Sequence, residues 1–345
     1  MNSSLISPID AVITWVDGAD PLHSEKLNRY LTSIGGARPH SANPARFNSV
    51  GEIEYCVVSL LRYAPWIRTI FIVTDNQQPS FMTKLQGTPF AQRIKIVDHS
   101  VIFSGREECL PSFNSMSISS QLWRIPNLAE QFLFLNDDFA LIRPVGADAF
   151  FCDQKLVLRG HWQVQSNHRW YRQLWRQMQK MKGIKEVARS IDRVKFIGVQ
   201  ENSARLFGYF KTVFQLEHNP HPWKLSQWEL FEKEHADVAR KNCCHHLRSA
   251  EQLVPEGIIA HLALRNNEAV IDNRLQTLQL KPADQALVRI KSKLARAERN
   301  ESYVFVCIQS LENAPAESFE LVTNWLRERI GNWDDFIEVE SKKSK

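Results

Sequence analysis

The sequence predicts an α/β fold: a doubly wound, mostly parallel sheet with helical additions at the C-terminal end. Two observations support this prediction. Short apolar runs alternate with helical segments in the N-terminal part of the chain, which is the pattern of strands covered by helices on both faces. Each run also leads into an acidic residue, and in open α/β sheets the ends of the strands are where ligands bind.

Four apolar runs are predicted to be buried strands, because they are β-branched or aromatic and too short for buried helices. They are AVITWV at 11–16, IFIVT at 70–74, IKIV at 94–97 and FLFL at 132–135. The acids that follow them are Asp17, Asp75, Asp98 and the pair Asp137-Asp138. We expect these carboxylates to lie at one rim of the sheet. The alternative is that aspartate is simply a common turn residue.

The predicted helices complete the fold. Residues 52–63 carry apolar side chains at helical spacing, and Pro65 ends the segment. The other predicted helices are 115–124, an amphipathic segment at 166–182, 282–299 and 319–330. We expect a catalytic domain over 1–275, with a helical insertion around 160–210, and a helical C-terminal extension over 276–345.

Composition narrows the class of protein. The 345 residues are 43% hydrophobic and 23% charged, which is ordinary for a globular protein, and the net charge of +5 favours anionic partners. No apolar run is long enough to span a bilayer, and residues 1–12 do not have the pattern of a signal peptide. The expected location is the cytoplasm, with peripheral association at the inner face of the plasma membrane.

The cysteines are scattered, and we interpret them as reduced thiols. The run from Cys243 to His246 contains four successive metal-ligand types. Adjacent side chains point in different directions, so the run suits zinc poorly.

The strongest chemical signal is Asp137-Asp138 at the end of the FLFL strand. Paired acids at a strand end can hold Mg²⁺ or Mn²⁺, which prefer hard oxygen ligands. Such a cation can bridge the phosphates of a nucleotide sugar. The alternative is that one acid merely caps a following helix.

Three further segments carry candidate site residues. The turn after the first strand contains Trp15, Asp17 and Gly18 but has neither a dinucleotide-binding nor a P-loop motif. The segment HNPHPW presents His218 and His221 on a backbone restricted by two prolines, and histidine is a common general base. Arg248 in HHLRSAE is able to clamp a phosphate.

Taken together, these segments resemble the Stealth family of hexose-1-phosphate transferases. That family includes bacterial capsule polymerases and the lysosomal-enzyme N-acetylglucosamine-1-phosphotransferase. The similar blocks run in order over most of residues 9–265: IDAVITWVDGADP, then Glu52 through YAPWIRTIFIVTDNQ, IKIVDHS and LPSFNS to FLFLNDD, then HNPHPW and HHLRSAE. Two features depart from the family pattern as we interpret it, namely Glu54 and the segment 21–48.

The resemblance implies a GT-A-like or Rossmann-like fold and a specific reaction. A UDP-sugar, such as a UDP-N-acetylhexosamine, gives its sugar 1-phosphate to a sugar hydroxyl of an oligosaccharide or polysaccharide acceptor, and UMP leaves. The implied catalytic residues are Glu52, His218 and Arg248, and the implied ligands of Mg²⁺ or Mn²⁺ are Asp137 and Asp138. The residues expected to bind the nucleotide sugar are Trp15, Asp17, Gly18, Asp75, Asn114 and His221.

Two rival functions remain at this point. A metal-dependent GT-A glycosyltransferase would break the bond at the sugar carbon and release UDP. A basic nucleic-acid-binding protein would need basic residues interleaved with aromatic ones, which only 166–182 offers, so we expect no nucleic-acid partner.

Overall fold

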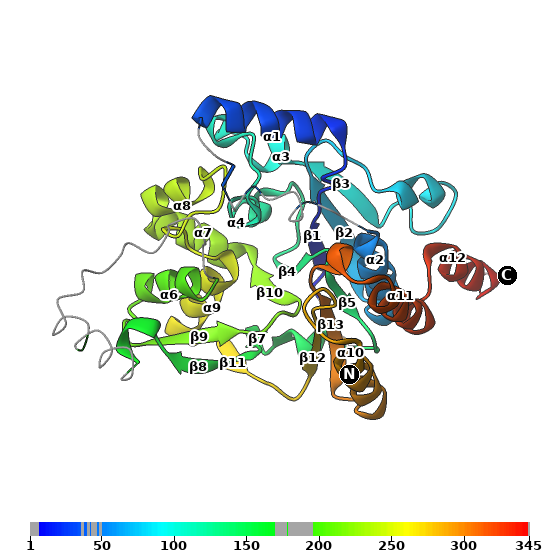
Figure 1. Cartoon of the computed structure of the whole chain (residues 1–345). Helices are drawn as coiled ribbons and strands as arrows, with labels where there is room; N and C mark the ends of the chain where they lie inside the picture. The colour runs from blue at the N-terminus through cyan, green and yellow to red at the C-terminus, as the bar shows by residue number, and fades with distance from the viewer. Residues whose placement is uncertain are drawn as a thin grey trace.

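The computed structural model describes residues 7–35, 38–39, 42, 47, 50–169, 178 and 196–343. A five-stranded sheet lies at its centre (Figure 1). The strand order is β10-β4-β1-β2-β3, where β1 is Ile9–Thr14, β2 Ile67–Thr74, β3 Ile94–Asp98, β4 Gln131–Asn136 and β10 His221–Lys224. The first four strands in the chain are mutually parallel, and β10 runs antiparallel to β4 at the edge. The four predicted strands and the mostly parallel sheet are confirmed.

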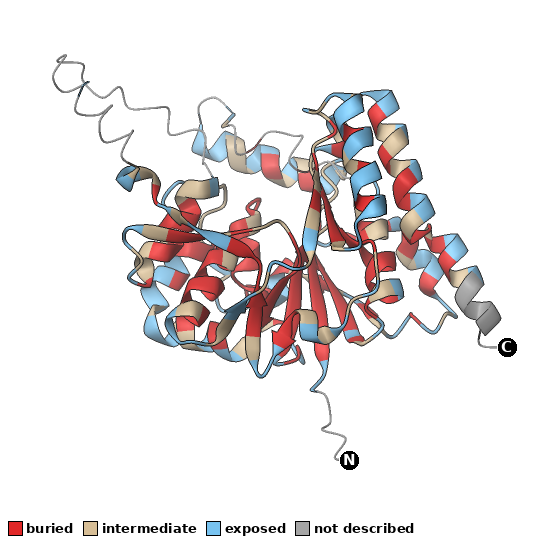
Figure 2. Ribbon diagram, turned by 90° about the horizontal axis from the view of Figure 1, so that it is seen from below, coloured by how far each residue is buried: buried red, intermediate tan, exposed pale blue. Residues whose placement is uncertain are grey.

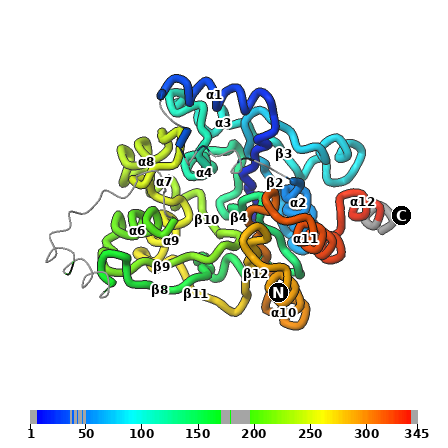
Figure 3. Tube along the Cα trace, in the orientation of Figure 1, coloured from blue at the N-terminus to red at the C-terminus, as the bar shows by residue number. Residues whose placement is uncertain are grey.

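Helices lie on both sides of this sheet. On one side are α2 (Glu52–Tyr63) and α11 (Ala316–Ile330), and on the other are α4 (Ser115–Ser119), α7 (Leu225–Glu234) and α9 (Pro255–Arg265) (Figures 1 and 3). The strands between them are almost entirely buried (Figure 2). The doubly wound α/β fold is therefore confirmed, and α2 has the predicted bounds.

The C-terminal part adds strands as well as helices. β12 (Gln276–Leu280) and β13 (Tyr303–Ile308) are parallel to each other, and β13 pairs antiparallel with β5 (Phe139–Leu141). The helices here are α10 (Leu287–Arg299), α11 and α12 (Trp333–Lys343). The predicted helical additions exist, but the two strands were not predicted. They join this part of the chain directly to the segment that follows Asp138.

The remaining described elements frame the core. They are α1 (Pro21–Ile34), α3 (His99–Ile102), α6 (Phe196–Leu206), α8 (Ala236–Cys243), β6 (Phe151–Cys152), β7 (Lys155–Leu158), β8 (Gly160–Val164), β9 (Thr212–Leu216) and β11 (Ala269–Ile271). Short 3₁₀ helices include η5 (Leu122–Arg124) and η7 (Ser166–His168). The expected helical insertion around 160–210 contains α6 and also β8, which pairs antiparallel with β9 just beyond it. Most of the amphipathic helix predicted at 166–182 lies outside the described residues.

The helix predicted at 115–124 is shorter than expected. Helix α4 ends at Ser119, and the 3₁₀ helix η5 follows. Serine hydroxyls within the segment bond backbone carbonyls, Ser119 to that of Ser115 and Ser117 to that of His245. Such bonds compete with a regular helix, which explains the break.

The described helices are of modest length, with 15 residues in α11 and 14 in α1. A helix that spans a bilayer needs about 20 apolar residues. Among the described helices, none combines the length and the apolarity for such a span.

One ion pair, between a buried aspartate and an exposed arginine, joins three segments of the sheet. Asp10 in β1 is fully buried and accepts hydrogen bonds from the Arg68 guanidinium at 2.9 and 2.5 Å. Its oxygens also accept from the backbone amides of Thr69 (3.1 Å) and Ala129 (2.8 Å). This carboxylate therefore fixes the start of β1 against β2 and against the segment that leads into β4.

We predict that Asp10→Ala destabilises the fold by about 2–4 kcal/mol, because two buried amide donors lose their acceptor and the guanidinium loses its partner. Urea unfolding measures this effect. The exposed pair Glu25–Arg29 provides the control, since Glu25→Ala removes a solvated ion pair and should leave the midpoint nearly unchanged. Equal midpoints for the two variants would contradict the role given to Asp10.

Candidate active site

A cavity of about 540 Å³ opens at the carboxyl ends of β1 and β4. Its wall contains Trp15, which follows β1, and Asn136, Asp137 and Asp138 at the end of β4. This is the edge at which ligands bind in open α/β sheets. The predicted residues Glu52 and Arg248 line the same cavity.

Asp137 and Asp138 occupy the turn between β4 and β5 and are half-buried in the cavity wall. Burial raises the pKa of Asp137 well above its usual range, and repulsion from Asp138 and Glu52 adds to the effect. Burial also raises the pKa of Asp138 to about 7, although a hydrogen bond from Cys307 opposes the shift. The Oδ1 atom of Asp138 is buried and has no hydrogen-bond partner in the described part of the chain. Both carboxylates are therefore poorly stabilised by the protein alone.

Glu52 is the first residue of α2. One of its oxygens accepts a hydrogen bond from the Val50 amide at 2.8 Å. The helix N-terminus favours the negative charge, but burial raises the pKa of Glu52, and Glu312 adds repulsion. Glu52 is thus a third carboxyl group with a raised pKa in this cavity.

The C-terminal part completes the cavity with residues that sequence reasoning missed. Lys281 follows β12, and Gln309 and Ser310 follow β13, so two parallel strands deliver these side chains to one edge. The amide of Ile308 donates to the Asp138 carbonyl at 3.0 Å, which holds this edge against the acidic pair. Other lining residues that were not predicted are His23, His99, Ser115, Asp284, Glu312 and Asn313. His99 and Ser115 lie within the blocks IKIVDHS and LPSFNS but were not chosen as site residues, and no motif marks the other four.

The cavity contains more acids than bases. Five carboxyl groups line it, against the two cations Arg248 and Lys281; the acids are Glu52, Asp137, Asp138, Asp284 and Glu312. A diphosphate would meet net repulsion here unless a cation accompanied it. In the described part of the chain, the only three metal-ligand side chains with atoms within 4.8 Å of one another are cysteines away from this cavity. A cation at Asp137 and Asp138 would therefore take its other ligands from water and substrate, as Mg²⁺ commonly does.

Arg248 is held by contacts between the α8–α9 connection and the start of α4. The Arg248 guanidinium donates to the Ser115 hydroxyl at 2.6 Å. Upstream, the His245 carbonyl accepts from the Asn114 side chain at 2.9 Å and from the Ser117 hydroxyl at 2.8 Å. Asn114 is fully buried and also bonds Gln252, so its side chain is used for structure. Asn114, predicted to contact the nucleotide sugar, instead positions the segment that carries Arg248.

A second cavity of about 370 Å³ shares part of its wall with the first, including Asp138 and Arg248. His218 and His221 line it. His218 lies in the β9–β10 connection and stacks on Phe196, with ring centroids 5.5 Å apart. Burial lowers the pKa of His218, and burial lowers that of His221 to about 3. Both imidazoles are neutral at pH 7, the form in which His218 can accept a proton.

Four predicted binding residues line neither cavity: Asn114, described above, and Asp17, Gly18 and Asp75. Asp75 accepts from Lys26 at 2.7 Å and lies 3.7 Å from His23, and despite burial these two partners hold its pKa well below its usual range. Asp17 accepts from the Ala19 amide at 2.9 Å in a local turn. Gly18 approaches Phe47 so closely that a Cβ would lie 2.5 Å from the Phe47 Cβ. The ordinary turn role of aspartate accounts for Asp17, and an ion pair accounts for Asp75.

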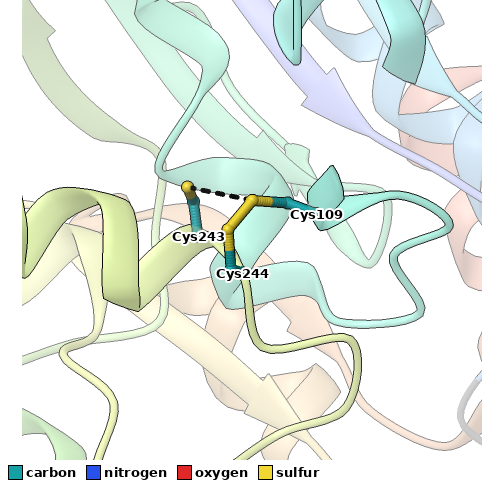
Figure 4. Close-up of side chains that lie close together, drawn as sticks. All are labelled: Cys109, Cys243 and Cys244. Carbon is teal, nitrogen blue, oxygen red and sulfur yellow. Dashed lines mark hydrogen bonds between the residues drawn. A yellow bond between two sulfur atoms is a disulfide. The ribbon is translucent and has the colours of Figure 1, made fainter. Parts of the chain in front are cut away.

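The cysteines differ from the sequence prediction. Cys109 and Cys244 form a disulfide, and the Cys243 sulfur lies 3.9 Å from that of Cys109 (Figure 4). The prediction that all six cysteines are reduced is therefore wrong in this structure. His246 bonds the Pro111 carbonyl through Nδ1 at 2.6 Å, apart from the sulfurs. The bridging cysteines lie 135 positions apart in a chain with no dense cysteine framework, so no local pattern points to this pair.

Two family regions match the chain. Residues 7–35 match "Stealth protein CR1, conserved region 1" and residues 46–158 match "Stealth protein CR2, conserved region 2". Part of the segment 21–48, which we interpreted as peculiar to this chain, therefore belongs to a conserved region. The matched residues include Glu52, Asp137 and Asp138. They end before His218 and Arg248.

Curated relatives share the same part of the chain. The exopolysaccharide phosphotransferase SCO2592 of Streptomyces coelicolor is 45% identical over 151 residues, which cover 43% of this chain and 15% of the relative. The capsular polysaccharide phosphotransferase LcbA of Aeromonas hydrophila is 39% identical over 146 residues, which cover 42% of this chain and 38% of the relative. The enzyme WcwK of Streptococcus pneumoniae, also named a capsular polysaccharide phosphotransferase, is 35% identical over 151 residues, covering 44% and 43%. The aligned segment thus spans less than half of each relative.

Solved structures resemble the chain only weakly. A galactosyltransferase LgtC, in complex with donor and acceptor sugar analogues, gives a TM-score of 0.43 at 11% identity and covers 93% of this chain and 96% of that one. The bifunctional glycosyltransferase WbbM gives a TM-score of 0.46 at 10% identity and covers 98% of this chain and 52% of its own. At these TM-scores the likeness supports no conclusion about the site.

Proposed function

Because residues 7–35 and 46–158 match Stealth conserved regions 1 and 2, we propose that the chain is a Stealth protein that transfers a hexose 1-phosphate from a UDP-sugar to a sugar hydroxyl. Peripheral association with the inner face of the plasma membrane, or with capsule assembly, is part of this proposal. The donor is a UDP-N-acetylhexosamine, the acceptor an oligosaccharide or polysaccharide, and the product a phosphodiester of a capsular or surface polysaccharide. The relatives named as capsular and exopolysaccharide phosphotransferases support this class of reaction. The observation that carries the proposal is the adjoining pair of cavities, one with the acidic pair and one with His218, which share Arg248.

The first cavity suits the donor. In this proposal Trp15 and the residues near the end of β1 contact the nucleotide, and the diphosphate lies toward Asp137 and Asp138. His221 is enclosed against Phe134 and supports the wall of the second cavity.

The carboxylates fit a divalent cation. Asp138 has a buried oxygen without a partner, and oxygen donors with raised pKa values gain most from a hard cation. Asp137 and Asp138 would hold Mg²⁺ or Mn²⁺, which when bound neutralises charge on the diphosphate. Glu52 lies close enough to raise the pKa of both acids, and we assign it the positioning of this centre.

The protein side chains account for the remaining chemistry. Neutral His218 takes the proton of the acceptor hydroxyl as its oxygen attacks the β-phosphorus. A bond forms between that oxygen and phosphorus, and the bond from phosphorus to the oxygen bridging the two phosphates breaks, so UMP leaves. Arg248 stabilises the charge on the transferred phosphoryl group, a role suited to its planar guanidinium. Phosphoryl transfer depends mainly on such positioning and charge stabilisation.

We predict that UDP-sugar labelled at the β-phosphorus passes its label into the polysaccharide. Attack at phosphorus moves that atom with the sugar, whereas attack at the sugar carbon leaves it on UDP. The measurement combines chromatography of the released nucleotide with phosphorus NMR of the product. UMP and a phosphodiester signal are expected. Unlabelled polymer with stoichiometric UDP would instead identify a glycosyltransferase acting at carbon.

A further inference from the structure

We propose that the second cavity is a binding subsite for an uncharged sugar ring of the acceptor, in which the amide of Gln200 recognises two adjacent hydroxyl groups. This inference rests on the proposed function, because it names the acceptor class and the residue that selects it. The subsite is built from α6, the β9–β10 connection and the start of α9.

Gln200 is the central observation. It projects from α6, is only 1% exposed and lines the second cavity. Neither its amide nitrogen nor its amide oxygen has a hydrogen-bond partner among the residues that the structure describes. A buried amide without partners costs free energy, so its presence in a cavity wall points to a ligand that supplies them. An amide offers a donor and an acceptor side by side, which matches two neighbouring hydroxyls of a sugar.

Glu256 adds a second polar group to the same wall. It is the second residue of α9, and its Oε2 atom is buried and has no partner among the described residues. Burial raises the pKa of Glu256 to about 7. Glu217 and Glu256 line only the second cavity, whereas the two cations of its wall, Arg248 and Lys281, also line the first and are shared with the donor phosphates. An acidic sugar in the second cavity would meet both carboxyls, so the subsite favours uncharged hexoses.

The cavity also offers apolar surface. Phe196, at the start of α6, is 41% exposed and stacks on His218, and the wall includes Met116, Phe139, Leu216 and Val254. Sugar rings present apolar C–H faces beside their hydroxyls, and binding sites for small molecules combine apolar walls with a few placed polar groups. A volume of about 370 Å³ lies within the usual range for such sites.

The shared wall fixes the direction in which the ligand would lie. The residues common to both cavities are Ser115, Asn136, Asp138, Arg248, Lys281 and Gln309. A sugar held by Gln200 would therefore direct one hydroxyl past His218 toward Arg248 and the donor phosphates. This order of contacts separates recognition at Gln200 from chemistry at His218.

The test compares Gln200→Leu with Gln227→Leu. Gln227 on α7 is likewise buried with one unpartnered amide atom, but it lines neither cavity, so it controls for loss of a buried amide. The acceptors are methyl glycosides of glucose, galactose, mannose and N-acetylglucosamine, together with the monodeoxy analogues of the one that gives turnover. Each variant is assayed for acceptor KM, donor KM and slow donor hydrolysis by water.

Gln200→Leu should raise the acceptor KM about ten- to hundredfold, since two hydrogen bonds to the sugar are lost, and leave donor KM and hydrolysis unchanged. Removing one of the recognised hydroxyls from the acceptor should raise its KM for the wild type. The same change should have little further effect on the KM for the variant. Gln227→Leu should keep the wild-type acceptor KM. An unchanged acceptor KM and unchanged sensitivity to deoxy analogues in Gln200→Leu would overturn the subsite, while UMP release by the wild type would still uphold the proposed function.

Saturation-transfer NMR with the same methyl glycosides gives a readout without turnover. If the wild type binds a glycoside and Gln200→Leu does not, the subsite is supported. If in addition no UDP-sugar yields UMP, only the proposed function is refuted. Absence of binding by every glycoside would overturn the subsite. Unfolding curves establish that Gln200→Leu is folded, and Gln200→Glu, which keeps the shape but loses the amide donor, provides a second variant with an expected intermediate effect.

Discussion

Replacing Asp137 or Asp138 by asparagine should reduce turnover by orders of magnitude and leave the protein folded. The amide keeps the size of the carboxyl group, but it removes the anionic oxygen that a divalent cation needs. UMP release is the measurement, and EDTA should abolish the activity of the wild type in the same way. Asp153→Asn, at an exposed turn outside both cavities, should retain wild-type turnover.

Stability provides an independent test of the same centre. The pKa of Asp138 is about 7 in the folded protein and near 3.8 when unfolded, so ionisation opposes folding once the pH exceeds the unfolded value. In EDTA, Asp138→Asn should therefore have a larger free energy of unfolding than wild type at about pH 8, and this difference should vanish at about pH 4. If Asp138→Asn is inactive and also less stable than wild type at about pH 8, Asp138 has a structural role. Full activity of the wild type in EDTA would refute the metal site.

The sheet was predictable because its strands carry a strong local signal. The runs that became β1, β2 and β4 are buried on both faces, so their apolarity is nearly continuous and independent of distant residues, whereas β3 at the edge is only partly buried. The strands β12 and β13 were missed because their stability depends on pairing with each other and with β5, far away in sequence. Such long-range pairing is not visible in local periodicity.

The site was predictable to the extent that its residues follow strands or stand in motifs. Asp137 and Asp138 lie at the cavity because the end of β4 puts them there. Asp98 follows a strand equally well, yet its side chain accepts from the Ser100 amide and caps α3. The spacing of an acid after a strand cannot distinguish these outcomes, since capping uses the same carboxylate.

Glu54 illustrates a residue whose role depends on a distant segment. It departs from the family pattern as we interpret it, and its side chain accepts from the Trp333 amide at 2.8 Å, at the start of α12. The carboxylate therefore caps a helix nearly 280 positions away in the chain. Its departure has a structural explanation and requires no change in donor or acceptor preference. Lys281 and Gln309 were missed at the site for the same reason, because only the folded C-terminal part brings them there.

Replacing His218 by alanine should reduce kcat about 10²- to 10⁴-fold, the usual contribution of a general base. The donor dissociation constant should change little, because His218 lines only the second cavity and the donor is assigned to the first. Donor binding is measured by UDP titration of the full chain, and turnover by UMP release. His161→Ala, at an exposed histidine in β8, should behave like wild type in both assays.

The pH profile distinguishes a base from a merely structural histidine. Burial lowers the pKa of His218, so the imidazole remains neutral and able to accept a proton down to a pH below its ordinary value of 6.5. Wild-type kcat/KM should fall as the pH decreases through that lowered pKa, because protonation removes the base, and His218→Ala should lose this acidic limb. If the variant keeps the limb, Glu52 or Glu256 is the base instead, since burial raises the pKa of both carboxyl groups. If it binds no donor, His218 is a binding residue, and the separation between a donor cavity and an acceptor cavity is wrong.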